Sequence, residues 1–264
     1  MTDDACNFYA RTLNPKNVWR PAVPISGRNC KDAVVLSIPL NLEQEVSLAT
    51  PPRTPPSNLI HQIVFVTDDP GAMRSYLADK GLVASGNAET SAGPEFAVND
   101  PEGHLIAFAG PNNLPIDSTS RNRRLIHAGF VVHDRAAEDK FYKDILGFHV
   151  YWHGGMKDGE TNWVDMQVPD GTDWIEYMLN VPPNASHKTL GVMNHIALGV
   201  PDIHAAEAQL RKNGWKGTEQ PQIGRDGKWQ LNLYDPDDTR VELMEFTPVE
   251  KPCCSEYTGP HPKP

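Results

Sequence analysis

The sequence lacks the features that would place the protein in a membrane, in an oxidising compartment or on nucleic acid. Four cysteines in 264 residues are too few for a disulfide framework, and no apolar run is long enough to cross a bilayer. The opening residues, MTDDACNFYARTL, lack a basic start followed by an apolar stretch, so we expect no signal peptide. The net charge of −10 argues against nucleic acid or an anionic membrane as partner. We therefore expect a cytoplasmic protein that binds a small-molecule substrate. A homodimer is a possible assembly.

What the sequence does contain is an internal repeat. Three segments begin with a histidine, continue as an apolar strand, reach an aspartate suited to cap a helix, and end that helix at a glycine. They are HQIVFVTDDPGAMRSYLADKGL from His61, HAGFVVHDRAAEDKFYKDILGF from His127 and HIALGVPDIHAAEAQLRKNGW from His195. The expected caps are Asp69, Asp134 and Asp202, and the expected stops are Gly81, Gly147 and Gly214.

The three segments also close alike, in a turn that leads into a final strand. The closing sequences are NDPEGHLIAFAG, VPDGTDWIEYML and YDPDDTRVELME. A fixed position in these strands lies 46, 49 and 47 residues after the opening histidine, and it holds Ala107, Glu176 and Glu242. One repeat unit therefore reads as a strand, a helix and about three further strands.

The repeat predicts an α+β fold made of βαβββ modules. FYARTLNP from Phe8 resembles FYKDILGF from Phe141, which suggests a further copy that is cut short at the start. The expected units are a partial N-terminal module over 1–50, a second module with a degenerate site over 58–110, a third over 124–180, a fourth over 192–247, and a tail over 248–264. Segments rich in Pro, Asn or Ser, among them 181–190, are expected to be linkers.

The tail, KPCCSEYTGPHPKP, contains two adjacent cysteines, Cys253 and Cys254. Its proline content favours a disordered segment with surface thiols over a metal or redox site.

Two histidines and two glutamates form a candidate metal site. Alternate residues of a strand share one face, so His127, Glu176, His195 and Glu242 should point away from the helices, on one side of their sheets. Two imidazoles and two carboxylates suit one divalent transition ion, namely Fe, Zn, Ni, Mn or Co. The two carboxylates would balance the charge of the ion, which explains why a half-buried strand carries Glu242. His61 is not expected to be a ligand, because Ala107 stands where its glutamate would be.

The same alternation indicates which side chains line a substrate pocket. Trp174 and Met178 flank Glu176 on its face, and Arg240 and Met244 flank Glu242. These four residues predict an apolar pocket with one cation, which suits a small organic anion or an aromatic compound.

Several of these motifs resemble the vicinal oxygen chelate superfamily, which includes glyoxalase I, extradiol ring-cleaving dioxygenases and bleomycin-resistance proteins. The matching motifs are NHIALGV, DWIEYMLN, FYKDILGF and YDPDDTRVELME, and the resemblance spans residues 59–246. It implies βαβββ modules that pair into cupped mixed sheets around one metal ion. Asp238 stands where the closing motif of the family usually has glycine.

The resemblance implies two metal patterns. The glyoxalase I pattern of His or Gln, Glu, His and Glu is filled completely by His127, Glu176, His195 and Glu242. The ring-cleaving pattern of two histidines and one glutamate around ferrous iron is filled by His127, His195 and Glu242. Ring-cleaving members typically carry an acid–base histidine before the closing turn, and no histidine lies between Gly214 and Glu242.

We therefore expect glyoxalase-like lyase or isomerase chemistry, with Glu176 or Glu242 moving a proton. A ferrous ring-cleaving dioxygenase and a metal-free small-molecule binding protein remain alternative hypotheses.

Overall fold

A computed structural model describes residues 8, 60, 62–84, 96–110 and 124–264, together with the backbone of two short strands between 36 and 48. These strands, β1 (Leu36–Asn41) and β2 (Gln44–Leu48), form an antiparallel hairpin. His61 and most of the expected N-terminal module lie outside the described residues.

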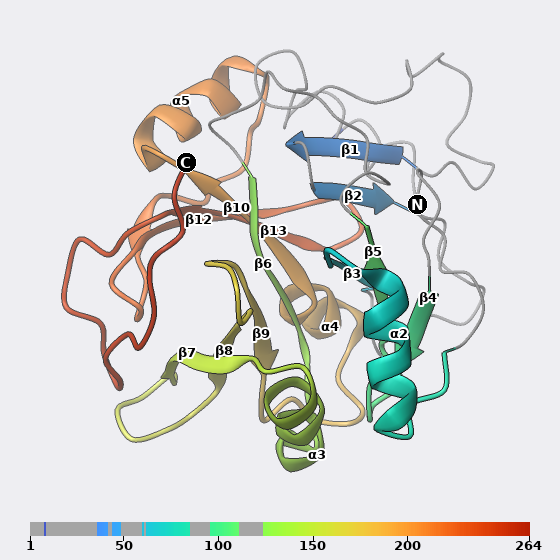
Figure 1. The fold of residues 1–264 in the computed structure, drawn as a ribbon. Helices are drawn as coiled ribbons and strands as arrows, with labels where there is room; N and C mark the ends of the chain where they lie inside the picture. Colours follow the sequence, from blue (N-terminus) through green and yellow to red (C-terminus); the bar gives the residue numbers. More distant parts are fainter. Residues whose placement is uncertain are drawn as a thin grey trace.

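The third and fourth modules together form one eight-stranded sheet. The third module contains β6 (Arg124–Val131), α3 (Arg135–Asp139), the π-helix η3 (Lys140–Ile145), β7 (His149–Gly154), β8 (Trp163–Gln167) and β9 (Trp174–Met178). The fourth contains β10 (His195–Val200), α5 (Ile203–Lys212), β11 (Gln222–Ile223), β12 (Trp229–Tyr234) and β13 (Arg240–Glu245). The strand order is β11-β12-β13-β10-β6-β9-β8-β7, which confirms the predicted pairing of βαβββ modules (Figure 1).

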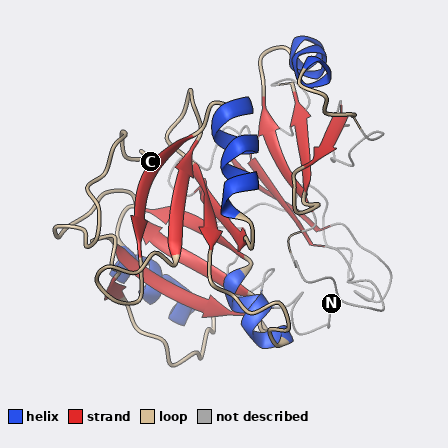
Figure 2. Cartoon of the chain, turned by 90° about the horizontal axis from the view of Figure 1, so that it is seen from below, coloured by secondary structure: helices blue, strands red, loops and turns tan. Residues whose placement is uncertain are grey.

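The two modules meet at their first strands. β6 and β10 pair antiparallel at the centre, and each also pairs in parallel with the last strand of its own module, β9 or β13. The four central strands are therefore those predicted to carry the histidines and glutamates. The sheet curls into a half-barrel, and α5 and the helical segment formed by α3 and η3 pack on its outer side (Figure 2).

The sequence signals for the ends of the helices are confirmed. Each aspartate cap accepts a hydrogen bond from the backbone N–H three residues further on, at 2.8 Å for Asp69, 3.1 Å for Asp134 and 2.9 Å for Asp202. The three stop glycines have φ between 80° and 97°, a conformation that glycine adopts readily.

The second module shares a core with the third. Its described elements are β3 (Gln62–Val66), α2 (Pro70–Asp79), β4 (Phe96–Asn99) and β5 (Leu105–Ala109), with strand order β3-β5-β4. Leu77 and Ile106 pack in one apolar cluster with Phe130 and Phe141 of the third module. Burial of this cluster joins the small sheet to the half-barrel.

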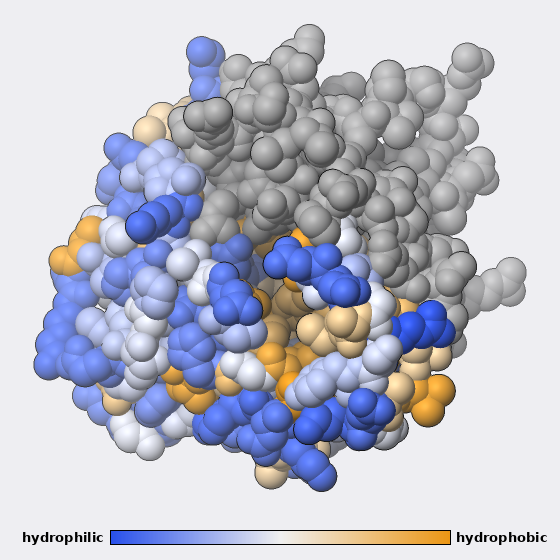
Figure 3. Space-filling view, in the orientation of Figure 1, coloured by the Kyte–Doolittle hydropathy of each residue, from blue (hydrophilic) through white to orange (hydrophobic). Residues whose placement is uncertain are grey.

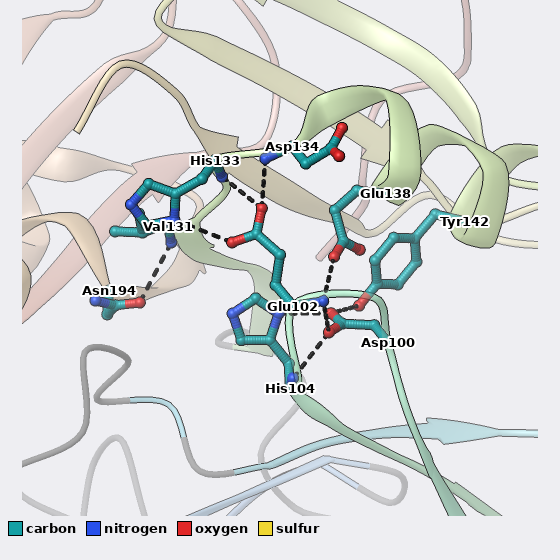
Figure 4. A network of polar contacts seen from close by, with 9 residues as sticks. All are labelled: Asp100, Glu102, His104, Val131, His133, Asp134, Glu138, Tyr142 and Asn194. Carbon is teal, nitrogen blue, oxygen red and sulfur yellow. Dashed lines mark hydrogen bonds and ion pairs between the residues drawn. The ribbon is translucent and has the colours of Figure 1, made fainter. Parts of the chain in front are cut away.

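A polar network strengthens the same junction (Figure 4). The Glu102 carboxylate lies in the turn before β5 and accepts hydrogen bonds from the backbone N–H groups of His133, at 2.5 Å, and Asp134, at 2.6 Å. These groups precede the first turn of α3, where N–H groups lack partners within the helix and a negative charge is favourable.

The expected linker over 181–190 is partly helical. α4 (His187–Met193) begins there, capped by the Ser186 hydroxyl, which accepts from the backbone N–H of Thr189 at 3.1 Å. Gly191 allows the helix to approach the backbone of Asp238, where a Cβ atom would clash. This tertiary contact is not visible in the local composition.

The prediction of a disordered tail with free surface thiols is wrong. Cys253 and Cys254 form a disulfide with each other, and the tail is hydrogen-bonded along the half-barrel. Thr258 donates its N–H to the Tyr151 carbonyl at 3.0 Å, and the Gln167 amide donates to the Pro260 carbonyl at 2.9 Å. Prolines remove backbone donors but do not prevent an extended chain from packing against a strand.

The described surface is predominantly hydrophilic, and apolar side chains gather around a hollow near the middle of the face shown in Figure 3. Within the described parts of the chain, every helix is too short or too polar to cross a bilayer.

The shared core predicts a large effect for Phe130, whose side chain is fully buried between the second and third modules. We expect Phe130→Ala to lower the free energy of unfolding by about 3–5 kcal/mol, because it leaves a cavity at the junction. Val83 is 87% exposed, and Val83→Ala should change stability by less than about 0.5 kcal/mol. Chemical denaturation measures both. A loss below about 1 kcal/mol for Phe130→Ala would show that the two modules do not depend on a common core.

Candidate metal centre

Four side chains from the central strands converge on the concave side of the half-barrel. His127 comes from β6, Glu176 from β9, His195 from β10 and Glu242 from β13. The histidines and Glu242 are at most 3% exposed, whereas the Glu176 side chain is 14% exposed. Side chains that can bind a metal are thus enclosed, with one glutamate closest to solvent.

The donor atoms lie close enough to share one ion. The two Nε2 atoms of the histidines are 3.0 Å apart. The Glu176 carboxylate is 3.1 Å from the His195 Nε2 and 3.6 Å from the His127 Nε2. The Glu242 carboxylate is 3.7 and 3.6 Å from the same two atoms. The donors of His127, Glu176 and His195 all lie within 4.8 Å of one another, so this cluster can bind one divalent ion.

Strand pairing creates the space for the His195 ring. Gly129 of β6 is the cross-strand partner of His195, and a Cβ atom on Gly129 would overlap the imidazole. The glycine therefore permits the ring to lie flat across β6 and to direct Nε2 toward the other donors.

The strict alternation expected for β6 is wrong at one position. Alternation along this strand places Ile126 opposite His127, on the helix side with Phe130, but Ile126 packs with Trp174 and Met244 on the side of the metal centre. The register of β6 against β10 shifts here, because Ala197 pairs with His127 while Leu198 pairs with Leu125. This β-bulge changes the side to which Ile126 points.

The His195 ring is oriented by its other nitrogen. Its Nδ1 lies 3.1 Å from the Met193 carbonyl, an acceptor that places the proton on Nδ1 and leaves the Nε2 lone pair for a ligand. The Arg240 guanidinium lies against the same ring, 2.8 and 2.9 Å from its two nitrogens. Arg240 also donates to the Asn232 amide oxygen at 3.2 Å.

Burial shifts the four donors toward their uncharged forms. It lowers the pKa of His127, to which the neighbouring His195 and Arg240 also contribute, and it lowers the pKa of His195, with Arg240 acting in the same direction. Burial raises the pKa of Glu176 to about 7 and that of Glu242 to about 8, against the effect of Arg240. Neutral imidazoles are ready to bind a metal, whereas the carboxyl groups must first release protons.

Three charged residues of the centre were not among the predicted site residues. Asp165 of β8 is the cross-strand partner of Glu176, and burial together with the Glu176 charge raises its pKa well above the usual value. Asp226 and Lys228 lie in the loop before β12 and are buried as well. The alternation of β8 could have indicated Asp165, but no local signal distinguishes the two loop residues.

A divalent ion would balance the charges of the centre. Its four carboxyl groups are Asp165, Glu176, Asp226 and Glu242, and its two cations are Lys228 and Arg240. Fully ionised, this set carries two negative charges, which one divalent ion neutralises. Without an ion, the carboxyl groups can avoid the cost of buried charge only by remaining protonated.

The predicted pocket residues lie around this cluster. The Trp174 ring packs against His127 with ring centroids 4.8 Å apart, and Arg240 contacts His195 as described. Met244 packs with Trp174 in one apolar cluster, while Met178 packs with Val131 in another.

Two further groups of possible ligands are less suitable. Asp100, His104 and Glu138 are close together, but Asp100 already accepts two backbone N–H groups, the His104 ring at 2.5 Å and the Tyr142 hydroxyl at 3.1 Å. The other group combines an exposed Asp158 with the two cysteines, whose sulfurs are joined in the disulfide and are not thiolates.

Comparison with known proteins identifies a family for the part of the chain that carries the site. Residues 124–243 match the model of the Glyoxalase/Bleomycin resistance protein/Dioxygenase superfamily. A search of curated proteins finds no match.

Several solved structures are similar in fold. A 2,2',3-trihydroxybiphenyl 1,2-dioxygenase from Sphingomonas wittichii is 15% identical, with a TM-score of 0.62 over 93% of this chain and 87% of that chain. A homoprotocatechuate 2,3-dioxygenase from Arthrobacter globiformis is 18% identical, with a TM-score of 0.63 over 93% and 76%. A halotolerant catechol dioxygenase is 16% identical, with a TM-score of 0.63 over 92% and 82%. These similarities establish the fold.

Metal affinity should rise with pH, because the two glutamates must lose their protons before they can bind an ion. With pKa values raised to about 7 and 8, Glu176 and Glu242 are protonated at pH 6, and an ion must displace these protons. We expect the affinity for Zn²⁺ to be at least about tenfold higher at pH 8 than at pH 6. Competition with a chelating dye measures it. An affinity that does not change over this range would contradict a site formed by these carboxyl groups.

The space above Gly129 predicts a second effect. We expect Gly129→Ala to weaken Zn²⁺ binding at least about tenfold, because the added methyl group displaces the His195 ring from the cluster. Gly71→Ala in α2, where the added Cβ meets only the Asp69 carboxylate at 3.3 Å, is the matched control and should bind Zn²⁺ like the unmodified chain. Circular dichroism checks that both variants fold, and equal affinities would show that His195 is not a ligand.

Proposed function

We propose that this chain, whose residues 124–243 form a domain of the glyoxalase/bleomycin resistance protein/dioxygenase superfamily, is a metal-dependent lyase or isomerase. Its substrate would be a small oxygenated compound that presents two neighbouring oxygens to the ion. The observation that supports this choice is the position of Glu176, 3.1 and 3.6 Å from the two imidazoles. Glu176 completes a set of two histidines and two glutamates, which matches the glyoxalase I pattern.

When bound by His127, Glu176, His195 and Glu242, a divalent ion would act as a Lewis acid on a substrate oxygen. The protein would supply the proton transfer. Glu176 and Glu242 have pKa values raised to about 7 and 8, near the value at which a carboxylate is an effective base at neutral pH. One of them would accept a proton from the carbon next to a carbonyl and return it to a neighbouring atom.

The walls of the pocket would keep the substrate in place. Trp174 and Met244 belong to one apolar cluster beside the metal centre, and this environment excludes water from the proton transfer. Arg240 lies against the His195 ring and would fix its orientation.

Ring cleavage at ferrous iron is the second candidate. His127, His195 and Glu242 would suffice for it, and the solved structures of similar fold include dioxygenases that act on trihydroxybiphenyl and catechol. In this arrangement Glu176 would not be a ligand. The two candidates therefore differ in how far removal of the Glu176 charge weakens metal binding.

Metal content of two matched variants distinguishes the candidates. The four-ligand site predicts that Glu176→Gln and Glu242→Gln each weaken binding of the resident ion at least about tenfold. The three-ligand site predicts the loss for Glu242→Gln alone. Elemental analysis after dialysis measures both. An unmodified chain without stoichiometric metal would contradict both enzymes and favour a metal-free binding protein.

Activity assays provide the corresponding functional test. We expect product formation from a hemithioacetal of glutathione, the model substrate, and no oxygen consumption with catechols. Replacement of the glutamate that acts as base, tested as Glu242→Gln and Glu176→Gln, should lower kcat by about 10²–10⁴-fold while the fold is retained. Oxygen uptake with a catechol would instead support the ferrous candidate.

A further inference from the structure

Lys228 is a buried lysine whose amino group lacks a polar partner. The residue lies directly before β12 and has a relative exposure of 0%. Its Nζ has no hydrogen-bond partner among the described residues. Lysine is almost never fully buried without a partner, because removing an ammonium group from water is costly. A fold that keeps Lys228 in this position therefore has a use for its free donors.

Three aromatic rings surround the amino group without using its hydrogen-bonding capacity. The Nζ lies 4.4 Å from the ring centroid of Trp174, 5.2 Å from that of Tyr257 and 5.3 Å from that of Tyr151. Contacts with ring faces stabilise a cation. The three rings come from β9, the C-terminal tail and β7, so the ordered tail completes this cage.

The cage adjoins the metal centre. The Trp174 ring contacts both Lys228 and His127, whose ring centroid is 4.8 Å away. The charge of Lys228 contributes to the lowered pKa of His127, which places it within electrostatic range of the cluster. β12 pairs with β13, with Asn232 opposite Glu242 and Gln230 opposite Met244, so alternation directs Lys228 to the same side.

The other cation of the centre is partly engaged. One terminal nitrogen of Arg240 donates to the Asn232 amide oxygen, and the other lies against the His195 ring. The Nε of Arg240 also lacks a hydrogen-bond partner, but Lys228 is the cation of the centre whose only charged nitrogen has none among the described residues.

We propose that Lys228 binds an anionic oxygen of the substrate held at the metal centre, which makes the substrate a small organic anion. The inference rests on the proposed function, because it requires a metal-bound substrate. Lys228 acts here as a substrate-binding residue, and its ammonium group gains from the ligand the partner that the protein does not provide.

The test compares a charged and an uncharged chelating probe. Oxalate presents two neighbouring oxygens and leaves further anionic oxygens free, whereas butane-2,3-dione has two neighbouring oxygens and no charge. Both are titrated calorimetrically into protein loaded with Mn²⁺, Ni²⁺ or Zn²⁺, whichever binds stoichiometrically. The variants are Lys228→Met and, as matched control, Lys251→Met, whose side chain is 81% exposed.

We expect Lys228→Met to weaken oxalate binding at least tenfold, to leave butane-2,3-dione binding unchanged and not to lower the metal content, and Lys251→Met to change none of them. Equal oxalate affinities in metal-loaded Lys228→Met and unmodified protein would overturn the role of Lys228 and leave the proposed function intact. Failure of the unmodified chain to bind any of the three metals would overturn both. If Lys228→Met does not fold, Lys228→Gln, which also lacks the charge, is judged by the same criterion.

Discussion

The constraint on which this structure depends is the burial of charge on the concave side of the half-barrel. Four carboxyl groups and two cations are enclosed where only apolar side chains are stable without compensation. Three features of the centre are unfavourable without a ligand. They are the excess of two negative charges, the short distance between the two imidazoles and the raised pKa values of Glu176 and Glu242. A divalent ion would satisfy all of them, and residues 124–243, which match the model of the Glyoxalase/Bleomycin resistance protein/Dioxygenase superfamily, form the sheet that brings its candidate ligands together.

The remainder of the architecture holds this charged centre in place. Antiparallel pairing of β6 with β10 brings the two halves of the site together, and the parallel neighbours β9 and β13 supply the glutamates. The second module adds no described ligand but buries Phe130 and anchors the start of α3 through Glu102. The C-terminal tail packs near the loop before β12, where the Tyr257 hydroxyl donates to the Asp226 carbonyl at 2.7 Å.

Much of this arrangement could be predicted because a duplicated module repeats its signals. The aspartate caps, the stop glycines and the alternation around Glu176 and Glu242 are local properties, and each appears at nearly the same spacing in two modules. Ile126 shows the limit of such reasoning. A one-residue bulge in β6 turns this side chain to the other face of the sheet. The bulge is visible only in the register of β6 against β10.

The sequence by itself determined the fold class, the order of the modules and the identity of the four side chains that could bind a metal, because these follow from periodicity and repetition along the chain. The tertiary structure alone decided that Lys228 and Asp226 lie beside the metal centre, that Tyr257 of the tail packs near them and that Gly129 makes room for His195. These facts depend on contacts between segments far apart in the chain, and the packing that creates them leaves no periodic trace in any one segment.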